Sequence, residues 1–241
     1  MAEARIRLYV EQALGPGQPV AVGADQANYL FNVMRLVAGQ SVLLFNGRDG
    51  EWQAVVEQAG KRAGMLRCGA MTAPLRLPPD LWLLFAPIKK ARTDFIVEKA
   101  VELGVARVVP VQTRRTNSER IRQDRLQAHA MEAAEQCGAT YVPEVADLMT
   151  LDKLLANWPA DRKLLWCDEA KAGAPTALTG DRGAPWAILI GPEGGFSAEE
   201  QQRLRAMPQV VSLSLGPRIL RADTAAVAAL TLWQAALGDW A

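Results

Sequence analysis

Apolar and polar residues alternate over the first part of the chain, and the alternation predicts several short β-strands. Residues 5–10 have the period-2 pattern of a strand with one apolar face. Residues 41–45 and 51–57 repeat the pattern, and the Asn-Gly and Asp-Gly pairs between them favour positive φ angles, so we expect a hairpin. Residues 65–71 predict another strand. Several short strands in succession are typical of a small β-barrel, which we predict for residues 1–72.

One short helix and a proline-rich segment complete this first part. Asp25 is a suitable N-cap for the helix. Leu30, Val33 and Met34 then follow with the spacing of a single apolar helix face. Residues 73–80 contain three prolines and no periodic pattern. We therefore predict that residues 73–80 are a linker between two domains.

From residue 81 to residue 241, apolar runs alternate with amphipathic segments. Residues 81–88 form a continuous apolar run, which is typical of a strand buried on both faces. Ser197 followed by Glu200 is a capping box that predicts the start of a helix. The other segments that we expect are strands at 105–111, 163–167, 186–190 and 210–215, and helices at 93–103, 120–136, 150–157 and 224–237. This alternation predicts an α/β fold with a parallel sheet covered by helices.

Composition narrows the class of protein. The chain has 241 residues, 27 Lys+Arg against 26 Asp+Glu, and 50% hydrophobic residues, which excludes intrinsic disorder as its main state. No apolar run is long enough to span a membrane, and the N-terminus has no signal-peptide core, so we expect a cytoplasmic protein. Basic residues concentrate in 86–125, where ten basic and five acidic side chains give a local charge of +5. Such a segment attracts a polyanion or is simply a solvated helix face.

Cysteine and histidine usage excludes several kinds of chemistry. The three cysteines are far apart in the chain, which fits neither a disulfide framework nor a CxxC zinc site. His129 is the single histidine, and it falls within a predicted helix where we expect a structural role. A single histidine in this position removes most Ser-His-Asp, Cys-His and His-rich metal chemistry. The chemistry must depend on Arg, Lys, carboxylate and backbone groups.

Two loops that follow predicted strands are candidate binding segments, because ligands of open α/β sheets bind beyond the carboxyl ends of the strands. Residues 191–195 (GPEGG) allow close backbone approach to a ligand, or form only a tight turn. They are neither a P-loop nor a dinucleotide fingerprint. In the loop 215–224, we expect Asp223 or Thr224 to cap the last helix. Arg221 precedes this cap and is either functional or an ordinary surface arginine.

The motifs resemble a known family in sequence order. The chain is similar to the bacterial 16S rRNA uridine-N3 methyltransferases (RsmE-like) of the SPOUT superfamily over nearly its whole length. The matching segments are residues 29–36, 89–94, 98–105, 110–111, 132–138, 191–197 and 215–224. Three positions depart from the family's pattern. Asn28 replaces a histidine, Ala139 an arginine and Asp223 a glutamate.

The resemblance implies a fold, a cofactor and a partner. The fold is an α/β domain at residues 81–241 with a SPOUT-type parallel sheet and a trefoil knot, preceded by a PUA-like RNA-binding β-barrel. It implies a homodimer, S-adenosylmethionine (SAM) as methyl donor without a metal, and 16S rRNA or the small ribosomal subunit as substrate. The cofactor-binding residues that it implies are Ile190, Gly191, Pro192, Gly194, Leu215, Gly216, Ile219, Leu220 and Thr224.

Catalytic and RNA-binding residues are hypotheses from residue type and position. Methylation at N3 removes the imino proton of an unpaired uridine, and we expect Arg221 to stabilise the resulting negative charge and Glu193 to accept the proton. The candidate RNA-binding residues are Arg5, Arg7, Arg35, Lys89, Lys90, Arg92, Arg114 and Arg115. The alternatives are a methyltransferase for another RNA position, such as a ribose 2′-hydroxyl, and a non-catalytic RNA-binding assembly factor.

Overall fold

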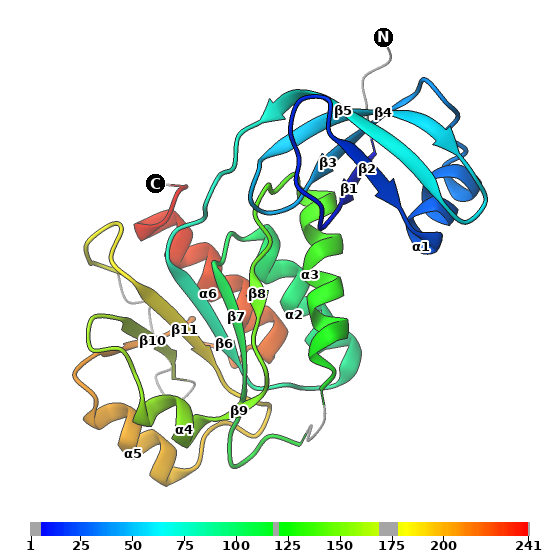
Figure 1. Cartoon of the computed structure of the whole chain (residues 1–241). Helices are drawn as coiled ribbons and strands as arrows, with labels where there is room; N and C mark the ends of the chain where they lie inside the picture. The colour runs from blue at the N-terminus through cyan, green and yellow to red at the C-terminus, as the bar shows by residue number, and fades with distance from the viewer. Residues whose placement is uncertain (1–5, 118–120, 169–177, 241) are drawn as a thin grey trace. The chain divides into compact units, whose positions relative to one another are not determined.

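The structure, a computed structural model, describes residues 6–117, 121–168 and 178–240. The chain divides into two compact units (Figure 1). The first unit comprises Met1–Leu77 and Ala134–Val142, and the second comprises Pro78–Ala133 and Pro143–Ala241. Each unit has its own sheet.

The first unit contains a five-stranded sheet with the order β1-β3-β4-β5-β2. Its strands are β1 (Arg7–Tyr9), β2 (Pro19–Val22), β3 (Ser41–Phe45), β4 (Glu51–Ala59) and β5 (Gly64–Ala73). The pairing of β1 with β3 is parallel, and the other pairings are antiparallel. The predicted hairpin is confirmed, since Leu44 of β3 lies opposite Trp52 of β4. The short strand β2 is not among the predicted elements.

The helical segment of the first unit differs from the prediction. It begins as α1 (Ala24–Ala27) and continues as a π-helix, η1 (Asn28–Val33). Gly23 is the N-cap, and Asp25 lies in the first turn. Leu30 is buried, but Val33 is 61% exposed and Met34 is also exposed. The prediction of one shared apolar face is wrong because the wider i→i+5 turn of a π-helix changes which side chains share a face.

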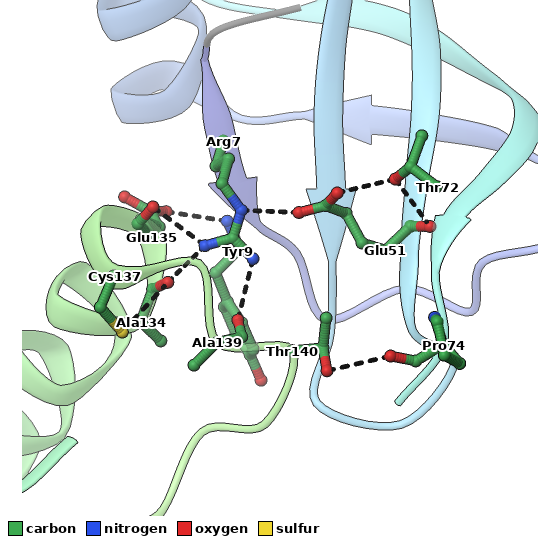
Figure 2. A network of polar contacts seen from close by, with 10 residues as sticks. All are labelled: Arg7, Tyr9, Glu51, Thr72, Pro74, Ala134, Glu135, Cys137, Ala139 and Thr140. Carbon is green, nitrogen blue, oxygen red and sulfur yellow. Dashed lines mark hydrogen bonds and ion pairs between the residues drawn. The ribbon is translucent and has the colours of Figure 1, made fainter. Parts of the chain in front are cut away.

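Residues 134–142 belong to the first unit although they follow it by more than fifty positions in the chain. The guanidinium of Arg7 donates to the carbonyl oxygens of Ala134, Glu135 and Ala139, at the end of helix α3 (Gln123–Cys137) (Figure 2). Its Nε lies 2.6 Å from a carboxylate oxygen of Glu51. The predicted boundary at residues 73–80 does not account for this return of the chain, which depends on hydrogen bonds between distant residues.

The second unit contains a seven-stranded sheet in which every strand pair is parallel. The strands follow the order β12-β10-β11-β6-β7-β8, and β9 pairs with β7. They are β6 (Leu81–Phe85), β7 (Arg107–Gln112), β8 (Glu144–Val145), β9 (Met149–Thr150), β10 (Lys163–Cys167), β11 (Trp186–Ile190) and β12 (Val210–Leu213). The predicted α/β class with a parallel sheet is therefore confirmed.

Helices cover the sheet of the second unit. They are α2 (Lys90–Glu102), the first part of α3, α4 (Leu151–Ala156), α5 (Ala198–Ala206) and α6 (Ala222–Leu237). Leu151 and Leu155 of α4 and Leu204 of α5 join one core cluster with sheet residues that include Leu189. Helix α6 packs on helix α2 and also contacts β11. Because the helices cover the faces of the sheet, loops lie at the carboxyl ends of the central strands.

The described residues contain no group of three or more His, Cys, Asp or Glu side chains that is placed to hold a metal ion. His129 is part of helix α3, with its Nε2 3.7 Å from Asp94 and its Nδ1 3.6 Å from Glu98, both on helix α2. Among the helices of the described part of the chain, none is long and apolar enough to cross a membrane.

Candidate functional site

A cavity of about 220 Å³ lies at the carboxyl ends of strands β10, β11 and β12. This edge of an open parallel sheet is where α/β proteins bind ligands. The residues that line the cavity come from the segments that follow the three strands and from the start of helix α6. They are Trp166, Cys167, Asp168, Ile190, Gly191, Pro192, Glu193, Gly195, Phe196, Gln201, Leu213, Leu215, Gly216, Arg218, Ile219, Leu220, Arg221, Ala222 and Ala225.

The loop after β11 forms one wall of the cavity. A Cβ atom at Gly191 would lie 2.7 Å from the ring of Phe196, so only glycine allows this ring to pack against the loop. The loop ends at Ser197, whose side chain accepts a hydrogen bond from the backbone of Glu200. The predicted capping box at the start of α5 is therefore confirmed, and it fixes where the loop stops.

The loop after β12 forms the opposite wall. Gly216 has a φ of +109°, which a residue with a side chain rarely adopts, and Ile219 is 82% exposed. The prediction that Asp223 or Thr224 caps the last helix is wrong, because the helix begins at Ala222 and Arg221 is its N-cap. Asp223 instead forms an ion pair of 3.1 Å with Arg92. This pair joins the first turns of α6 and α2.

Seven of the nine residues that the sequence implies for cofactor binding line this cavity: Ile190, Gly191, Pro192, Leu215, Gly216, Ile219 and Leu220. Gly194 and Thr224 are not among the lining residues. The carbonyl of Gly194 accepts a hydrogen bond of 2.8 Å from Arg115 instead, and Thr224 is exposed on the first turn of α6.

The third wall, at the end of β10, was not found from the sequence. Trp166, Cys167 and Asp168 line the cavity because β10 lies between β11 and β12 in the sheet. Burial raises the pKa of the Cys167 thiol to about 12, so this side chain stays neutral. The only signal in the sequence was the predicted strand at residues 163–167, which ends at this wall. Strand order, which places this end at the cavity, is a property of the tertiary fold.

Both candidate catalytic side chains line the cavity. Arg221 and Glu193 come from opposite walls, and both are exposed. Within the described residues, the guanidinium of Arg221 makes no hydrogen bond or ion pair. Arg218, which the sequence did not single out, also lines the cavity and is exposed. The cavity therefore presents cationic groups to a ligand without a protein anion already bound to Arg221.

Five of the candidate RNA-binding residues follow strands β6 and β7, the next strands of the sheet after β11. Lys89 is the N-cap of α2, and Lys90 and Arg92 lie in its first turn. Arg114 and Arg115 follow β7 and are exposed. Since the strands are parallel, all five lie at the same edge of the sheet as the cavity.

The loops that carry these groups are held together by Glu200, which is buried. One of its carboxylate oxygens accepts a 2.8 Å hydrogen bond from the backbone of Arg114, and the other accepts one of 2.8 Å from the backbone of Ser197. Glu199 is the neighbour of Glu200 in the chain. Hydrogen bonds from the backbone of Glu199 itself and from Ser197, together with the charges of Arg114 and Arg115, lower the pKa of Glu199. The basic loop after β7 and the cavity loop after β11 are thus connected.

The candidate RNA-binding residues of the first unit differ from one another. The side chain of Arg7 is only 12% exposed, and four of its five N–H groups donate to Glu51 and to the end of α3, so it is committed inside the first unit. Its prediction as an RNA-binding residue is withdrawn. Arg35 is exposed and has a φ of +57°. Arg5 lies outside the described residues.

Comparison with known proteins identifies the class of protein. A family model for an RNA methyltransferase domain matches residues 75–234, which is most of the chain and contains the whole cavity. A model for an RNA methyltransferase PUA domain matches residues 22–64. The chain therefore belongs to the RNA methyltransferase family that these two domains define.

Individual relatives show which RNA methyltransferases the chain is most usefully compared with. The chain is 28% identical to "Ribosomal RNA small subunit methyltransferase E" of Rickettsia conorii, over 93% of each chain. It is 31% identical to a methyltransferase of Legionella pneumophila solved in complex with SAM, with a TM-score of 0.86 over 97% of this chain and 98% of that one. It is 27% identical to the small subunit methyltransferase E of Neisseria gonorrhoeae bound to SAM, with a TM-score of 0.84 over 98% of this chain and 99% of that one. The family resemblance predicted from the motifs is confirmed.

Proposed function

We propose that this protein is a SAM-dependent methyltransferase that methylates N3 of a uridine in the 16S rRNA of the small ribosomal subunit. The observation that carries the proposal is the cavity at the ends of β10, β11 and β12, which is lined by both predicted cofactor loops and by Arg221. The names of the similar proteins support the substrate, and the structures of two of them contain SAM.

The residues of the cavity fit SAM, which has a flat adenine, a ribose and a charged methionyl part. Leu213, Leu220 and Ala225 supply apolar surface for the adenine faces. Within the described residues, the backbone N–H groups of Leu215 and Leu220 have no protein acceptor, so they are available to the polar edge of a ligand. When bound, SAM supplies an activated methyl group.

The side chains around the cavity have distinct roles in this proposal. The target uridine is unpaired and out of its stack, since its N3 proton otherwise occupies the Watson–Crick edge. Arg221 stabilises the negative charge that spreads over the uracil oxygens when this proton leaves. Glu193, exposed on the opposite wall, accepts the proton. The loops hold the base close to the methyl donor, which contributes to the rate through proximity.

RNA binding involves basic groups next to the cavity, all of them exposed except Arg92, which is partly buried and paired with Asp223. Lys89, Lys90, Arg92, Arg114 and Arg115 contact phosphates on the RNA strand that carries the target base. Arg35 supplies a further phosphate contact from the first unit. Arg7 takes no part, because its guanidinium is committed inside the first unit.

The domain assignment extends the same proposal. Residues 1–72 are a PUA-like RNA-binding barrel, 73–80 a linker, and 81–241 a SPOUT methyltransferase domain whose chain forms a trefoil knot and a homodimer. Two observations support the assignment of residues 81–241. The parallel strand order β12-β10-β11-β6 supports the SPOUT domain, and the exposed apolar side chains of Ile219 and Leu232 support the homodimer. Such an enzyme acts in the bacterial cytoplasm. Sedimentation of the purified protein tests the dimer directly.

The test of the proposed function is methyl transfer from labelled SAM to small-subunit particles that lack the modification, with naked 16S rRNA in parallel. We expect N3-methyluridine when the labelled nucleoside is identified by mass spectrometry. A labelled ribose 2′-hydroxyl would contradict the assigned position and leave a methyltransferase of the same fold. SAM binding without any transfer would contradict the substrate. A protein that binds RNA but no SAM would be a non-catalytic assembly factor.

A further inference from the structure

Two neighbouring arginines, Arg114 and Arg115, follow strand β7 and differ in their contacts with the loop after β11. Both side chains are exposed, and both are phosphate ligands in the proposed function. We propose that Arg115 is also a positioning residue for the methyl donor, because it holds the cavity wall with one N–H group and an RNA phosphate with the others. Binding of RNA and binding of SAM are then coupled through one side chain. This inference rests on the proposed function and deepens it.

The guanidinium of Arg115 is bonded to the middle of the loop after β11. One of its Nη atoms donates a hydrogen bond of 2.8 Å to the carbonyl oxygen of Gly194. The residues on either side of Gly194, Glu193 and Gly195, both line the cavity. A Cβ atom on Gly194 would lie 3.4 Å from the Cβ of Arg115, so the two loops are in contact here. A group that holds Arg115 in place therefore also holds this wall of the cavity.

The exposed part of the loop depends on this bond. The N–H of Gly195 donates to the carbonyl of Pro192 at 2.9 Å, which closes a turn within the loop. Glu193 and Gly194, inside that turn, are exposed. Within the described residues, the bond from Arg115 is the one hydrogen bond that joins these two residues to another part of the chain. Its loss frees the segment that carries Glu193.

Most donors of Arg115 remain available to a ligand. A guanidinium has five N–H groups in a planar fork, and within the described residues Arg115 uses one of them and forms no ion pair. A phosphate on the other N–H groups restricts the side chain to the position that also bonds Gly194. Each ligand thereby lowers the cost of ordering this loop for the other. The coupling is reciprocal, as thermodynamic linkage requires.

Arg114 has the same charge, but it is attached to the protein in a different way. Its backbone N–H donates to the buried Glu200, a contact that does not depend on the side chain. Its guanidinium is 3.9 Å from Asp152 and, within the described residues, forms no hydrogen bond with the loop after β11. The side chain of Arg114 is therefore suited to a phosphate contact that does not involve the cavity wall.

The first test is calorimetric binding of SAM to the full-length protein without RNA. We expect Arg115→Met to weaken SAM binding by about 3- to 10-fold, the effect of one hydrogen bond. Arg114→Met is the matched control, with the same change of side chain one position away and unchanged SAM binding expected. Both variants should bind naked 16S rRNA more weakly than the wild type, because each loses a phosphate contact.

The second test measures the coupling itself. The affinity for small-subunit particles that lack the modification is compared with and without S-adenosylhomocysteine, which occupies the cavity but transfers no methyl group. We expect wild type and Arg114→Met to bind the particles about fivefold more tightly with this ligand, and Arg115→Met to show no such gain. Arg115→Lys should recover particle affinity without the gain, because a lysine ammonium lacks the planar fork that holds two acceptors in fixed positions.

Steady-state kinetics give an independent readout. Arg115→Met should raise the KM of both SAM and particles, whereas Arg114→Met should raise the KM of particles alone. Wild-type SAM affinity in Arg115→Met, an equal loss in Arg114→Met, or a coupling that survives Arg115→Met overturns the inference and leaves the proposed function intact. A wild-type protein that binds no SAM overturns both.

Discussion

Arg7 in the first unit and Arg221 in the second were both expected to be functional, yet the structure gives them opposite surroundings. Arg7 is nearly buried, pairs with Glu51 and donates to three carbonyl oxygens at the end of α3 (Figure 2). Arg221 is exposed in the cavity wall, and within the described residues its guanidinium has no hydrogen-bond partner. An arginine that is nearly buried and donates four hydrogen bonds within the protein stabilises the fold, whereas one whose guanidinium lies at a cavity without partners is available to a ligand.

The same contrast separates the carboxylates of the two regions. Glu51 is buried and accepts hydrogen bonds from Arg7 and from the hydroxyl of Thr72. Glu193 lines the cavity and is exposed to water. Residue type and charge were equal at these positions in the sequence. The number and quality of partners, which only the fold supplies, distinguish structural from functional groups.

The largest effect that we expect is on stability, from Arg7→Met. This change leaves Glu51 buried without its cation and removes the donors that satisfy the end of α3, so the free energy of unfolding should fall by about 3–5 kcal/mol. Urea unfolding followed by circular dichroism measures it. Arg35→Met is the control, an exposed arginine of the same unit, with an expected change within about 0.5 kcal/mol. Equal stability of the two variants would remove the distinction drawn above.

Arg221→Ala should affect the reaction and not the fold. We expect the rate of methyl transfer to fall by about 100- to 1000-fold, as when one donor to a developing anion is removed, with the dissociation constant of SAM nearly unchanged. Single-turnover transfer to small-subunit particles measures the rate, and calorimetry measures binding. Arg218→Ala removes the neighbouring exposed arginine of the cavity and should cost much less. A rate close to that of the wild type would exclude the role given to Arg221.

Glu200→Ala tests whether the second unit also contains a fully paired carboxylate. Glu200 is buried, accepts hydrogen bonds from the backbone of Arg114 and Ser197 and completes the capping box of α5. Its loss should lower the free energy of unfolding by about 1–2 kcal/mol. Thermal unfolding of this variant and of Glu199→Ala, an exposed neighbour in the same turn, gives the comparison. A larger loss in Glu199→Ala would contradict the assignment.

Asp49 gives the smallest expected effect, and it depends on pH. A hydrogen bond from the backbone of Leu14, followed by one from the side chain of Asn46, lowers the pKa of Asp49. A lowered folded-state pKa means that the stabilisation is complete above the unfolded value of about 4 and is lost as the pH falls through the folded value. Wild type should therefore be more stable than Asp49→Asn at pH 7, and the difference should shrink below about pH 4. A difference that is constant down to pH 2 would contradict this.

Much of the fold followed from local patterns. The strands at Lys163–Cys167 and Trp186–Ile190 have the limits that their apolar runs predict, and the capping box at Ser197 fixes the start of α5 as expected. These signals are local, since burial on both faces and a capped helix end depend on a few adjacent residues. The π-helix at Asn28–Val33 was missed because its wider turn gives an apolar pattern that also fits an ordinary helix.

The candidate site was predicted in part. The two glycine-containing loops were found, and seven of their nine named residues line the cavity, because strand ends and glycines are visible in the sequence. Trp166 and Asp168 were missed, since their strand had to be placed between β11 and β12 before its end reached the cavity. Arg7 was misjudged because its partners lie more than forty positions away in the chain.

By itself, the sequence determined the class of fold, the position of the two loops and the family to which the chain belongs. These depend on periodicity, turn chemistry and motifs that short segments carry. The tertiary structure decided which strand ends meet, which charged groups are paired, and that the end of α3 belongs to the first unit. The physical reason is that pairing and burial are relations between residues far apart in the chain, and only the folded chain brings them within contact distance.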